Sequence, residues 1–309
     1  ICVVGPTATG KTKMGVALAK RFGGEVVSVD SMQIYRGMTI GTAAPTAEET
    51  EGIPHHMVAV ADPAESWSVA RFTEQADRCI QDILCRGRRP VLVGGTGLYL
   101  DSILSGRTFA AGHSGGEVRR ALQTELAQDG IEPLYRQLQA IDPTAAARLH
   151  LSDEKRILRA LEAFRETGET ITAHDARTRL RPPKYRAYTI GLTFRDRADL
   201  YERIDCRVDT MVGQGLLQEV EALLKSGLPE TATALQAIGY KQFLSVYRGD
   251  TPARDAVAEV KLRSRQYAKR QLTWLRRKED IHWILWEKTP DFPAGLQNAT
   301  EYLLAQGLG

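Results

Sequence analysis

The stretch GPTATGKT, residues 5–12, decides the fold class, because it fits the phosphate-binding pattern G-x-x-x-x-G-K-[ST]. The apolar run ICVV before it predicts a short strand, and the residues from Lys11 to Phe22 predict a helix that ends at Gly23 and Gly24. In this setting the glycines let backbone N–H groups surround an anion, and the helix directs its positive end at that anion. Lys11 adds a charge, and the Thr12 hydroxyl is placed to ligate Mg²⁺. We therefore predict a strand–loop–helix phosphate site of the kind that binds ATP and other nucleotides.

Strands and helices alternate along the first hundred residues. Strands are predicted for EVVSVD (25–30), HHMVAV (55–60) and PVLVGG (90–95), and a helix for residues 69–85. This alternation is typical of a parallel sheet with right-handed crossovers, whose ligands gather at the carboxyl ends of the strands. The prediction is therefore an α/β fold, with a P-loop NTPase-like parallel sheet flanked by helices.

The character of the sequence changes between residues 108 and 186. β-branched runs give way to charge-rich helical segments such as EVRRALQTELAQDG (117–130) and DEKRILRALEAFRETG (153–168). AYTIGLTF (187–194) and IHWILWE (281–287) then restore strands, and the segments between them are helical. We therefore predict two domains: an α/β core with C-terminal helices, residues 1–107 and 187–309, and a helical insertion, residues 108–186.

The composition, with 43% hydrophobic and 26% charged residues, is that of an ordinary globular protein. The longest apolar runs have the length of strands, so no membrane span is predicted. The four cysteines form no C-x-x-C pair and no cluster with zinc spacing, which is typical of reduced thiols in a cytoplasmic protein. We expect a cytoplasmic monomer.

Asp30 is an acid at the end of a predicted strand, close behind the phosphate loop. The PVLVGG strand, by contrast, runs into Gly-Gly-Thr-Gly without an acid. Two interpretations of Asp30 stay open: it caps a turn or supports a metal, or it is a general base in the site. The loop DSMQIYRGMTIGTAAP (30–45) is rich in small and polar residues, as expected of a substrate-binding loop. Thr96 follows the PVLVGG strand and is expected at the same edge of the sheet.

Positive charge is concentrated in two stretches, although the formal net charge is only +3. Residues 259–280 carry eight Lys or Arg against three acids, and residues 177–186 carry five basic residues and no acid. In the first stretch Lys261, Arg265 and Lys269 recur at helical spacing and are expected to form one positive ridge. A solvated helix face is the common alternative, but this segregation of charge favours a polyanionic partner.

Seven motifs follow one another along the chain: GPTATGKT, DSMQIYRGMTIGTAAP, GIPHH, VGGTGLYL, RALEAFRETGE, AIGYKQF and RQYAKRQLTW. Together they closely resemble the bacterial tRNA dimethylallyltransferases, and the resemblance covers essentially the whole chain. Each motif alone is weak, whereas the ordered set is highly specific. One departure is Thr9, where the family commonly has serine; the hydroxyl is retained.

The resemblance implies a reaction. A dimethylallyl group would pass from dimethylallyl diphosphate to N6 of the adenosine 3′-adjacent to the anticodon in certain tRNAs, with Mg²⁺ as cofactor and pyrophosphate as leaving group. The phosphate loop would then hold a leaving group rather than a nucleotide to be hydrolysed. The implied partners are dimethylallyl diphosphate and the anticodon stem-loop of tRNA, whose target base must leave its stack to reach a buried site.

The resemblance also implies roles for individual residues. Asp30 would accept the N6 proton, Thr96 would hold the amine or the diphosphate by its hydroxyl, and Lys11 would complete the catalytic set. The expected diphosphate contacts are Gly5, Pro6, Thr7, Ala8, Thr9, Gly10, Lys11, Thr12 and Arg207, with Thr12 as metal ligand and Arg203 as a weaker candidate. The expected tRNA contacts are Asp30, Ser31, Met32, Gln33 and Thr96 in the core, Arg119, Lys155, Arg156, Ile157, Leu158 and Arg159 in the insertion, and Gln236, Ala237, Ile238, Gly239, Tyr240 and Lys241 further on. For Arg203 and Arg207 the alternative is a surface ion pair with Glu202 or Asp205.

Three other functions stay open. A prenyltransferase that acts on free AMP, ADP or ATP would use the same phosphate loop and Asp30, although the helical insertion and the basic helix favour a polynucleotide acceptor. A P-loop kinase or NTPase would transfer or hydrolyse a phosphoryl group. An RNA-binding protein without catalytic activity is disfavoured by the intact Gly10, Lys11, Thr12 and Asp30.

Overall fold

The computed structural model describes residues 1–106, 116–179 and 182–308. The chain divides into two compact units, Ile1–Ile103 with Arg186–Gly309, and Leu104–Tyr185. They correspond to the core and the insertion of the sequence analysis. The predicted boundary at residue 108 itself lies outside the described residues, and each unit is considered on its own below.

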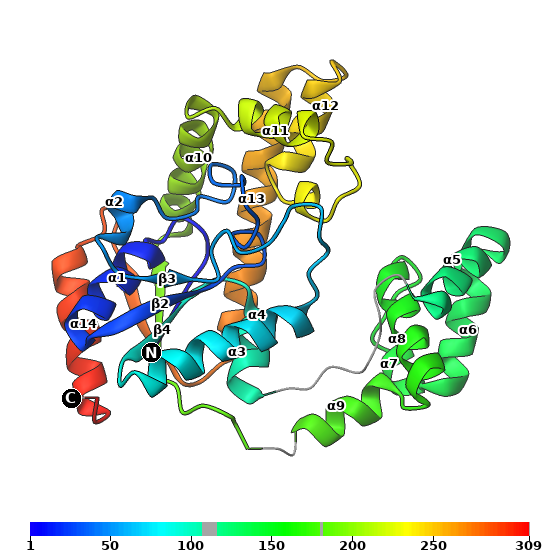
Figure 1. Ribbon diagram of the computed structural model, residues 1–309, viewed down its shortest axis with the longest axis horizontal. Helices are drawn as coiled ribbons and strands as arrows, with labels where there is room; N and C mark the ends of the chain where they lie inside the picture. The colour runs from blue at the N-terminus through cyan, green and yellow to red at the C-terminus, as the bar shows by residue number, and fades with distance from the viewer. Residues whose placement is uncertain (107–115, 180–181, 309) are drawn as a thin grey trace. The chain divides into compact units, whose positions relative to one another are not determined.

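The first unit contains a six-stranded, entirely parallel sheet (Figure 1). Its strands are β1 (Cys2–Val4), β2 (Gly24–Val29), β3 (His55–His56), β4 (Arg89–Gly94), β5 (Thr189–Phe194) and β6 (Ile281–Trp286). Their order in the sheet is β3-β2-β4-β1-β5-β6, so the strand before the phosphate loop is flanked by β4 and β5. This order confirms the predicted α/β fold with a parallel sheet.

Strand β3 is much shorter than predicted. The sequence suggested a strand over residues 55–60, but pairing with β2 stops at His56. Met57 and Ala59 have φ angles of 62° and 52°, in the left-handed region, which is incompatible with an extended strand. The prediction was wrong for residues 57–60 because a short apolar run does not reveal such backbone turns.

The helices of the first unit surround this sheet. They are α1 (Lys11–Phe22), α2 (Ala47–Thr50), α3 (Val69–Cys85), α4 (Gly97–Ser105), α10 (Arg197–Gly213), α11 (Leu216–Lys225), α12 (Tyr240–Tyr247), α13 (Ala253–Leu275) and α14 (Phe292–Ala305), with a 3₁₀ turn at Ala234–Gln236. Helix α1 packs on β1, β2 and β4, α3 on β2 and β4, and α14 on α1 and β6. Gly23 ends α1 in the left-handed conformation, as its position suggested.

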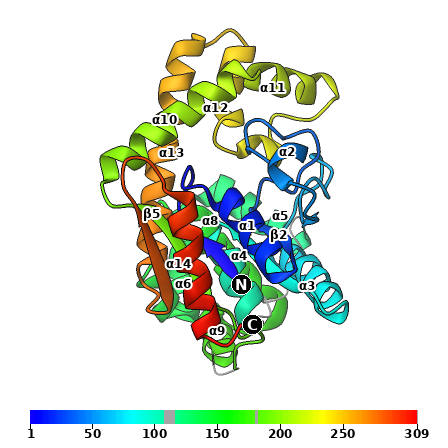
Figure 2. The same ribbon diagram turned by 90° about the vertical axis from the view of Figure 1, so that its left-hand side faces the viewer.

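Helices α10 and α13 lie side by side, and Figure 2 shows α11 and α12 near one end of this pair. The core between sheet and helices is built from buried apolar side chains such as Val3, Leu18, Val93, Ile204 and Trp286. Because the strands are covered by helices, they are apolar along most of their length, and functional groups are left to the loops at the strand ends. Within the described parts of the chain, no helix is both long and apolar enough to cross a membrane.

The second unit is helical. Its elements are α5 (Glu117–Asp129), α6 (Ile131–Ile141), α7 (Pro143–Ala146), α8 (Glu154–Thr167) and α9 (Ile171–Arg179). Leu122, Leu134, Leu138, Ile157 and Leu161 form its own core. The buried Asp142 carboxylate caps α7 at Ala145 N–H (2.9 Å) and accepts from the Thr172 hydroxyl (2.7 Å), which ties α9 to this bundle.

Candidate active site

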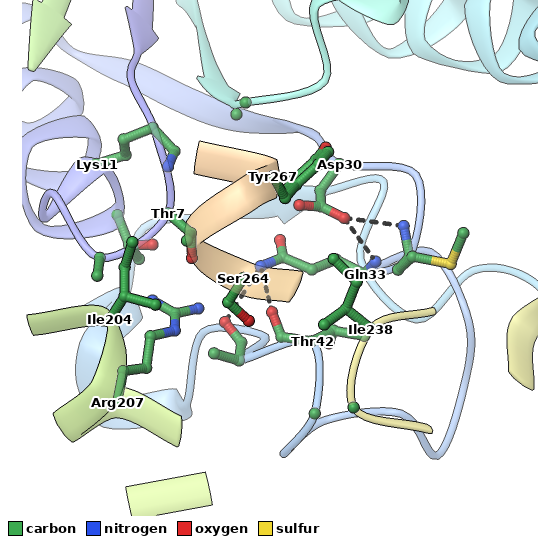
Figure 3. A pocket seen from close by; sticks show the side chains of 18 of the residues that line it. Thr7, Lys11, Asp30, Gln33, Thr42, Ile204, Arg207, Ile238, Ser264 and Tyr267 are labelled. Carbon is green, nitrogen blue, oxygen red and sulfur yellow. Dashed lines mark hydrogen bonds between the residues drawn. The ribbon is translucent and has the colours of Figure 1, made fainter. Parts of the chain in front are cut away.

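A cavity of about 600 Å³ opens at the carboxyl ends of the strands, within the first unit. Its walls come from the phosphate loop, the loop after β2, and helices α10 and α13 (Figure 3). In this view Thr7, Lys11 and Arg207 lie toward one side of the cavity, and Asp30, Gln33 and Ile238 toward the other. This is the edge of a parallel sheet at which ligands are expected.

Hydrogen bonds within the protein fix the backbone conformation of the phosphate loop, which leaves room for an anion. Gly5, Ala8 and Gly10 have φ angles of 152°, 67° and 82°. The Thr9 hydroxyl donates to Pro6 O (2.9 Å), and Thr9 O accepts from Trp286 Nε1 (3.0 Å). Thr9 is buried, so its side chain closes the loop from within, and its implied contact with the diphosphate stays a prediction for its backbone N–H. The remaining loop and the unpaired N–H groups of the first turn of α1 face the cavity.

Gly10 is required for steric reasons as well. A Cβ at this position would lie 2.4 Å from Cζ of Phe292, the first residue of α14. Because Phe292 packs directly on the loop, only glycine fits between them.

Two cations, Lys11 and Arg207, line the cavity, and neither forms an ion pair with a carboxylate of the residues that the structure describes. Lys11 Nζ donates to Pro6 O at 2.7 Å. Burial lowers the pKa of Lys11 to about 7, and the charge of Arg207 contributes to the same lowering. Burial also lowers the pKa of Arg207, which forms no hydrogen bond or ion pair with any residue in the described ranges. The charge of Asp30 acts on both cations and that of Glu49 on Arg207, but neither carboxylate forms an ion pair with them in the described ranges. Two partly desolvated cations without a directly paired carboxylate form a site that an anion would stabilise.

The alternative of surface ion pairs for the two arginines is wrong. Asp205 pairs with Arg265, and Glu202 pairs with Lys288. Arg203 Nε donates to Ala8 O (3.3 Å), so this arginine supports the phosphate loop at the cavity wall.

Asp30 lies at the other side of the cavity, directly after β2. Its Oδ1 accepts from the backbone N–H groups of Met32 (2.8 Å) and Gln33 (3.3 Å), which forms an Asx turn. Its Oδ2 accepts no hydrogen bond from a described residue. The carboxylate therefore combines both interpretations from the sequence: one oxygen caps a turn, and the other is available to accept a proton.

Tyr267 on α13 lines the cavity beside Asp30, whereas Thr96, which follows Gly95, is not among the residues that line it. Thr96 Oγ1 is buried and has no hydrogen-bond partner among the residues that the structure describes. Burial raises the pKa of the nearby Tyr267 hydroxyl, and the Asp30 charge acts in the same direction. The Tyr267 hydroxyl lies close enough to interact with Thr96, so it is the group within reach of this buried hydroxyl.

Sequence reasoning missed two side chains that shape this site. The Gln271 amide bridges Thr7 N–H and Gly95 O. Glu219 on α11 accepts four hydrogen bonds, of 2.8–3.0 Å, from Thr39, Ile40 and Gly41. Both lie on helices far along the chain from the loops they hold. The motif RQYAKRQLTW includes Gln271 and could have drawn attention to it, whereas no quoted motif includes Glu219.

The loop after β2 is fixed rather than free. The Gln33 amide accepts from the Ser28 hydroxyl (2.9 Å) and donates to Thr42 O (3.3 Å) and Ala43 O (3.1 Å). Both N–H donors of Gln33 are therefore engaged by the protein, so this side chain positions the wall of the cavity. Ser31 and Met32 line the same wall.

The QAIGYK segment contributes only in part as expected. Gln236, Ala237, Ile238 and Gly239 line the cavity, and Lys241 is exposed. Tyr240, however, is completely buried, and its hydroxyl donates to Glu219. Its side chain is not available to RNA, so the predicted tRNA contact of Tyr240 is wrong.

The tRNA contacts predicted in the insertion also fall into exposed and buried residues. Lys155 and Arg156 are exposed on α8, whereas Ile157 and Leu158 are buried in the core of the second unit. The last two cannot offer their side chains to tRNA, because a helical run places consecutive residues on different faces. Arg119 and Arg159 converge on the buried Glu162, at 3.6 Å and 2.9 Å.

The predicted basic ridge on α13 is also wrong. Lys261 pairs with Asp209 (2.7 Å) and Arg265 with Asp205 (2.7 Å), so these cations face α10. Lys269 remains exposed. In the second basic stretch, Arg177 pairs with Glu169, and Arg181 lies outside the described residues. The spacing correctly placed the basic residues on one face of the helix, but it did not reveal that acids of α10 lie opposite that face.

A magnesium ion would find few protein ligands here. No group of three or more His, Cys, Asp or Glu in the described residues could hold a metal. Thr12 lines the cavity at the start of α1 and offers one hydroxyl. This donor set fits Mg²⁺ held jointly by a protein oxygen, water and the oxygens of a bound diphosphate, rather than a metal caged by protein.

The fold and this site define a P-loop α/β protein whose phosphate loop and two cations line a cavity together with a carboxylate. Two family models match: IPP transferase over residues 33–278 and isopentenyl transferase over residues 1–59. The chain belongs to the tRNA dimethylallyltransferase (IPP transferase) family.

Similar proteins cover the chain from end to end. A tRNA dimethylallyltransferase of Acetivibrio thermocellus is 41% identical over 308 residues, with 100% of this chain and 98% of the relative covered. That of Geobacter metallireducens is 44% identical over 284 residues, with 92% and 91% covered.

Solved structures agree. The tRNA isopentenylpyrophosphate transferase of Bacillus halodurans has a TM-score of 0.72 at 41% identity, with 99% of this chain and 95% of that chain covered. A eukaryotic dimethylallyltransferase that acts on tRNA has a TM-score of 0.81 at 30% identity, with 98% and 77% covered.

Proposed function

We propose that the protein transfers the dimethylallyl group of dimethylallyl diphosphate to N6 of the adenosine 3′-adjacent to the anticodon in tRNA, with release of pyrophosphate. The observation that carries this proposal is the cavity itself. Lys11 and Arg207, which form no ion pair with a described residue, lie toward one side, and Asp30, whose Oδ2 accepts no hydrogen bond from a described residue, lies toward the other. One side suits an anionic leaving group, and the other suits an amine that must lose a proton.

The chemistry follows from this division. The amine N6 attacks the allylic C1, the N6–C1 bond forms as the C1–O bond breaks, and the bonding electron pair leaves with pyrophosphate. Asp30 Oδ2 takes the N6 proton, which strengthens a poor nucleophile as the new bond forms. Lys11, Arg207 and the N–H groups of α1 stabilise the negative charge that develops on the leaving group, and this electrostatic effect is expected to be the largest.

The cavity also has apolar walls. The apolar residues that line it are Ile204, Val208 and Met211 on α10, which also carries Arg207, and Val260 on the neighbouring helix α13. These side chains suit the five-carbon group of the donor, since an apolar lining favours a hydrocarbon over water. Mg²⁺, with Thr12 as its protein ligand, would neutralise part of the diphosphate charge.

The acceptor is proposed to be tRNA rather than a free nucleotide. Exposed Lys155 and Arg156 of the second unit and Lys241 of the first are positioned on surfaces that could meet phosphates. An adenosine inside a folded anticodon loop would have to swing out of its stack to enter the cavity. The protein is accordingly proposed to act in the cytoplasm, where tRNA is modified.

A transfer assay tests the proposal. Radiolabelled dimethylallyl diphosphate is incubated with the protein and Mg²⁺, and with either unmodified tRNA, an anticodon stem-loop, or AMP, ADP and ATP. Transfer to tRNA and to the stem-loop is expected. Transfer confined to free nucleotides would replace the acceptor, and phosphoryl transfer from ATP without any prenyl transfer would refute the reaction.

A further inference from the structure

Gln271 joins the two sides of the cavity through one side chain. It lies on α13 and is 7% exposed. Its Oε1 accepts from Thr7 N–H at 3.1 Å, and its Nε2 donates to Gly95 O at 3.0 Å. One rigid, planar amide therefore spans the phosphate loop and the loop that follows β4.

Gly95 is shaped for this bridge. A Cβ at position 95 would lie 2.2 Å from Gln271 Nε2, a distance that real Cβ atoms do not tolerate. Gly95 has no positive φ, so its role is space and not backbone conformation. The glutamine and the glycine are therefore two halves of one contact, although they are 176 residues apart in sequence.

The two ends of the bridge belong to different chemical tasks. Thr7 lies in the phosphate loop, at the diphosphate side of the cavity. Gly95 directly precedes Thr96, whose buried hydroxyl lacks a described partner and whose N–H donates to Val29 O (3.4 Å), next to Asp30. Tyr267, one helical turn before Gln271, lies close to both Thr96 and Gln271. Helix α13 thus fixes the distance between the phosphate loop, on the leaving-group side, and the loop after β4, on the acceptor side.

We infer that Gln271 is a positioning residue, which sets the distance between the bound diphosphate and the acceptor amine. This inference rests on the proposed function. Substitution at an allylic carbon needs the incoming nitrogen and the leaving oxygen on opposite sides of C1, and a misplacement of about 1 Å can cost on the order of a hundredfold in rate. Gln271 acts through Thr7 and Thr96 and does not itself touch the reacting atoms.

The test is a set of single-turnover rates with Gln271→Leu, Thr96→Ala and the double variant. We expect Gln271→Leu to lower the rate of transfer at least about tenfold, with KM for dimethylallyl diphosphate and tRNA changed less than about threefold. Because part of the effect of Gln271 passes through Thr96, the loss in the double variant should be smaller than the product of the two single losses. Losses that multiply independently would overturn the inference.

A matched control comes from the same helix. Gln266 contacts Arg263 and does not line the cavity, so Gln266→Leu makes the same chemical change without touching the bridge. It should leave the rate within about twofold of the wild type.

A second route displaces the amide without removing it. Gly95→Ala should lower the rate as strongly as Gln271→Ala, but adding Gly95→Ala to Gln271→Ala should cost less than about twofold more, because the smaller side chain frees the space. Thermal unfolding of each variant separates a misfolded protein from a mispositioned site. Wild-type protein without transfer activity would contradict the proposed function, whereas equal rates for wild type and Gln271→Leu would contradict only the role of Gln271.

Discussion

At the scale of the residue, Asp30 has two carboxylate oxygens in different surroundings. Oδ1 holds the turn to Met32 and Gln33, while Oδ2 is open to the cavity. Asp30→Asn keeps an oxygen for the turn but removes the proton acceptor. We expect the single-turnover rate to fall about a hundredfold or more, while tRNA affinity changes less than threefold.

Asp30→Ala provides the comparison, because it removes both the turn and the base. It should be at least as slow as Asp30→Asn and less stable. If Asp30→Asn retained the wild-type rate, the carboxylate would be only a turn residue and the acceptor of the proton would have to be another group.

Because burial lowers the pKa of Lys11, the free energy of unfolding is expected to depend on pH. This pKa falls from 10.5 in the unfolded chain to about 7 in the fold, so between these values the unfolded state binds more protons. The destabilisation is complete below pH 7 and is relieved as the pH rises. Between pH 7.5 and 9 the free energy of unfolding of the wild type should therefore rise relative to Lys11→Met, by about 1 kcal/mol per pH unit.

Urea unfolding of both proteins at several pH values measures this difference. Lys13→Met, at an exposed neighbouring position, is the control and should run parallel to the wild type. A constant difference between wild type and Lys11→Met would show that the lysine is as well solvated as in the unfolded chain.

At the scale of the element, Glu219 couples α11 to the loop after β2. Its carboxylate accepts from Thr39, Ile40 and Gly41 and from the Tyr240 hydroxyl. In Glu219→Gln, an amide N–H₂ would face backbone donors. We expect a loss of about 1–3 kcal/mol in the free energy of unfolding, with faster hydrogen exchange at residues 39–43.

Tyr240→Phe is the matched variant for this element. It removes one hydrogen bond and leaves the carboxylate in place, so a loss of about 1 kcal/mol is expected. Exchange rates at residues 39–43 that do not change in Glu219→Gln would show that the loop is held by other contacts.

At the scale of the whole molecule, the salt dependence of tRNA binding should depend on exposed basic side chains and not on those that are paired with acids. Lys155 and Arg156 are exposed in the second unit. If each contacts a phosphate, neutralising both to Gln should reduce the slope of log affinity against log salt by about 1.4 to 1.8. Filter binding of tRNA between low and moderate salt measures this slope.

The control replaces Lys261 and Arg265, which are paired with acids of α10. Their change to Gln should leave the slope nearly unchanged. A flatter slope only in this control would place the RNA on α13 instead of the second unit.

The limits of prediction from sequence follow from the range of each interaction. The phosphate loop, α1 and the placement of Asp30 at a strand end were predictable, because a local pattern determines each of them. The roles of Gln271 and Glu219 were not, because the loops they hold lie 176 to 264 residues away. The motif RQYAKRQLTW contains Gln271, but it does not say what that side chain contacts. The ridge on α13 was misjudged because spacing defines a face of a helix, while Asp205 and Asp209 decide what that face meets.

The contact between Trp286 and the phosphate loop has a consequence for biosynthesis. The indole of Trp286 donates to Thr9 O across 277 residues, and Phe292 packs on Gly10. At about 5–20 residues per second, a ribosome needs about 15–55 s to add that length of chain. For most of this time the phosphate loop lies outside the ribosome while Trp286 and Phe292, which contact it, have not yet been added to the chain. The phosphate loop therefore cannot gain these two contacts before residues 286 and 292 have been synthesised, and we expect no consumption of prenyl donor by the nascent chain before that point.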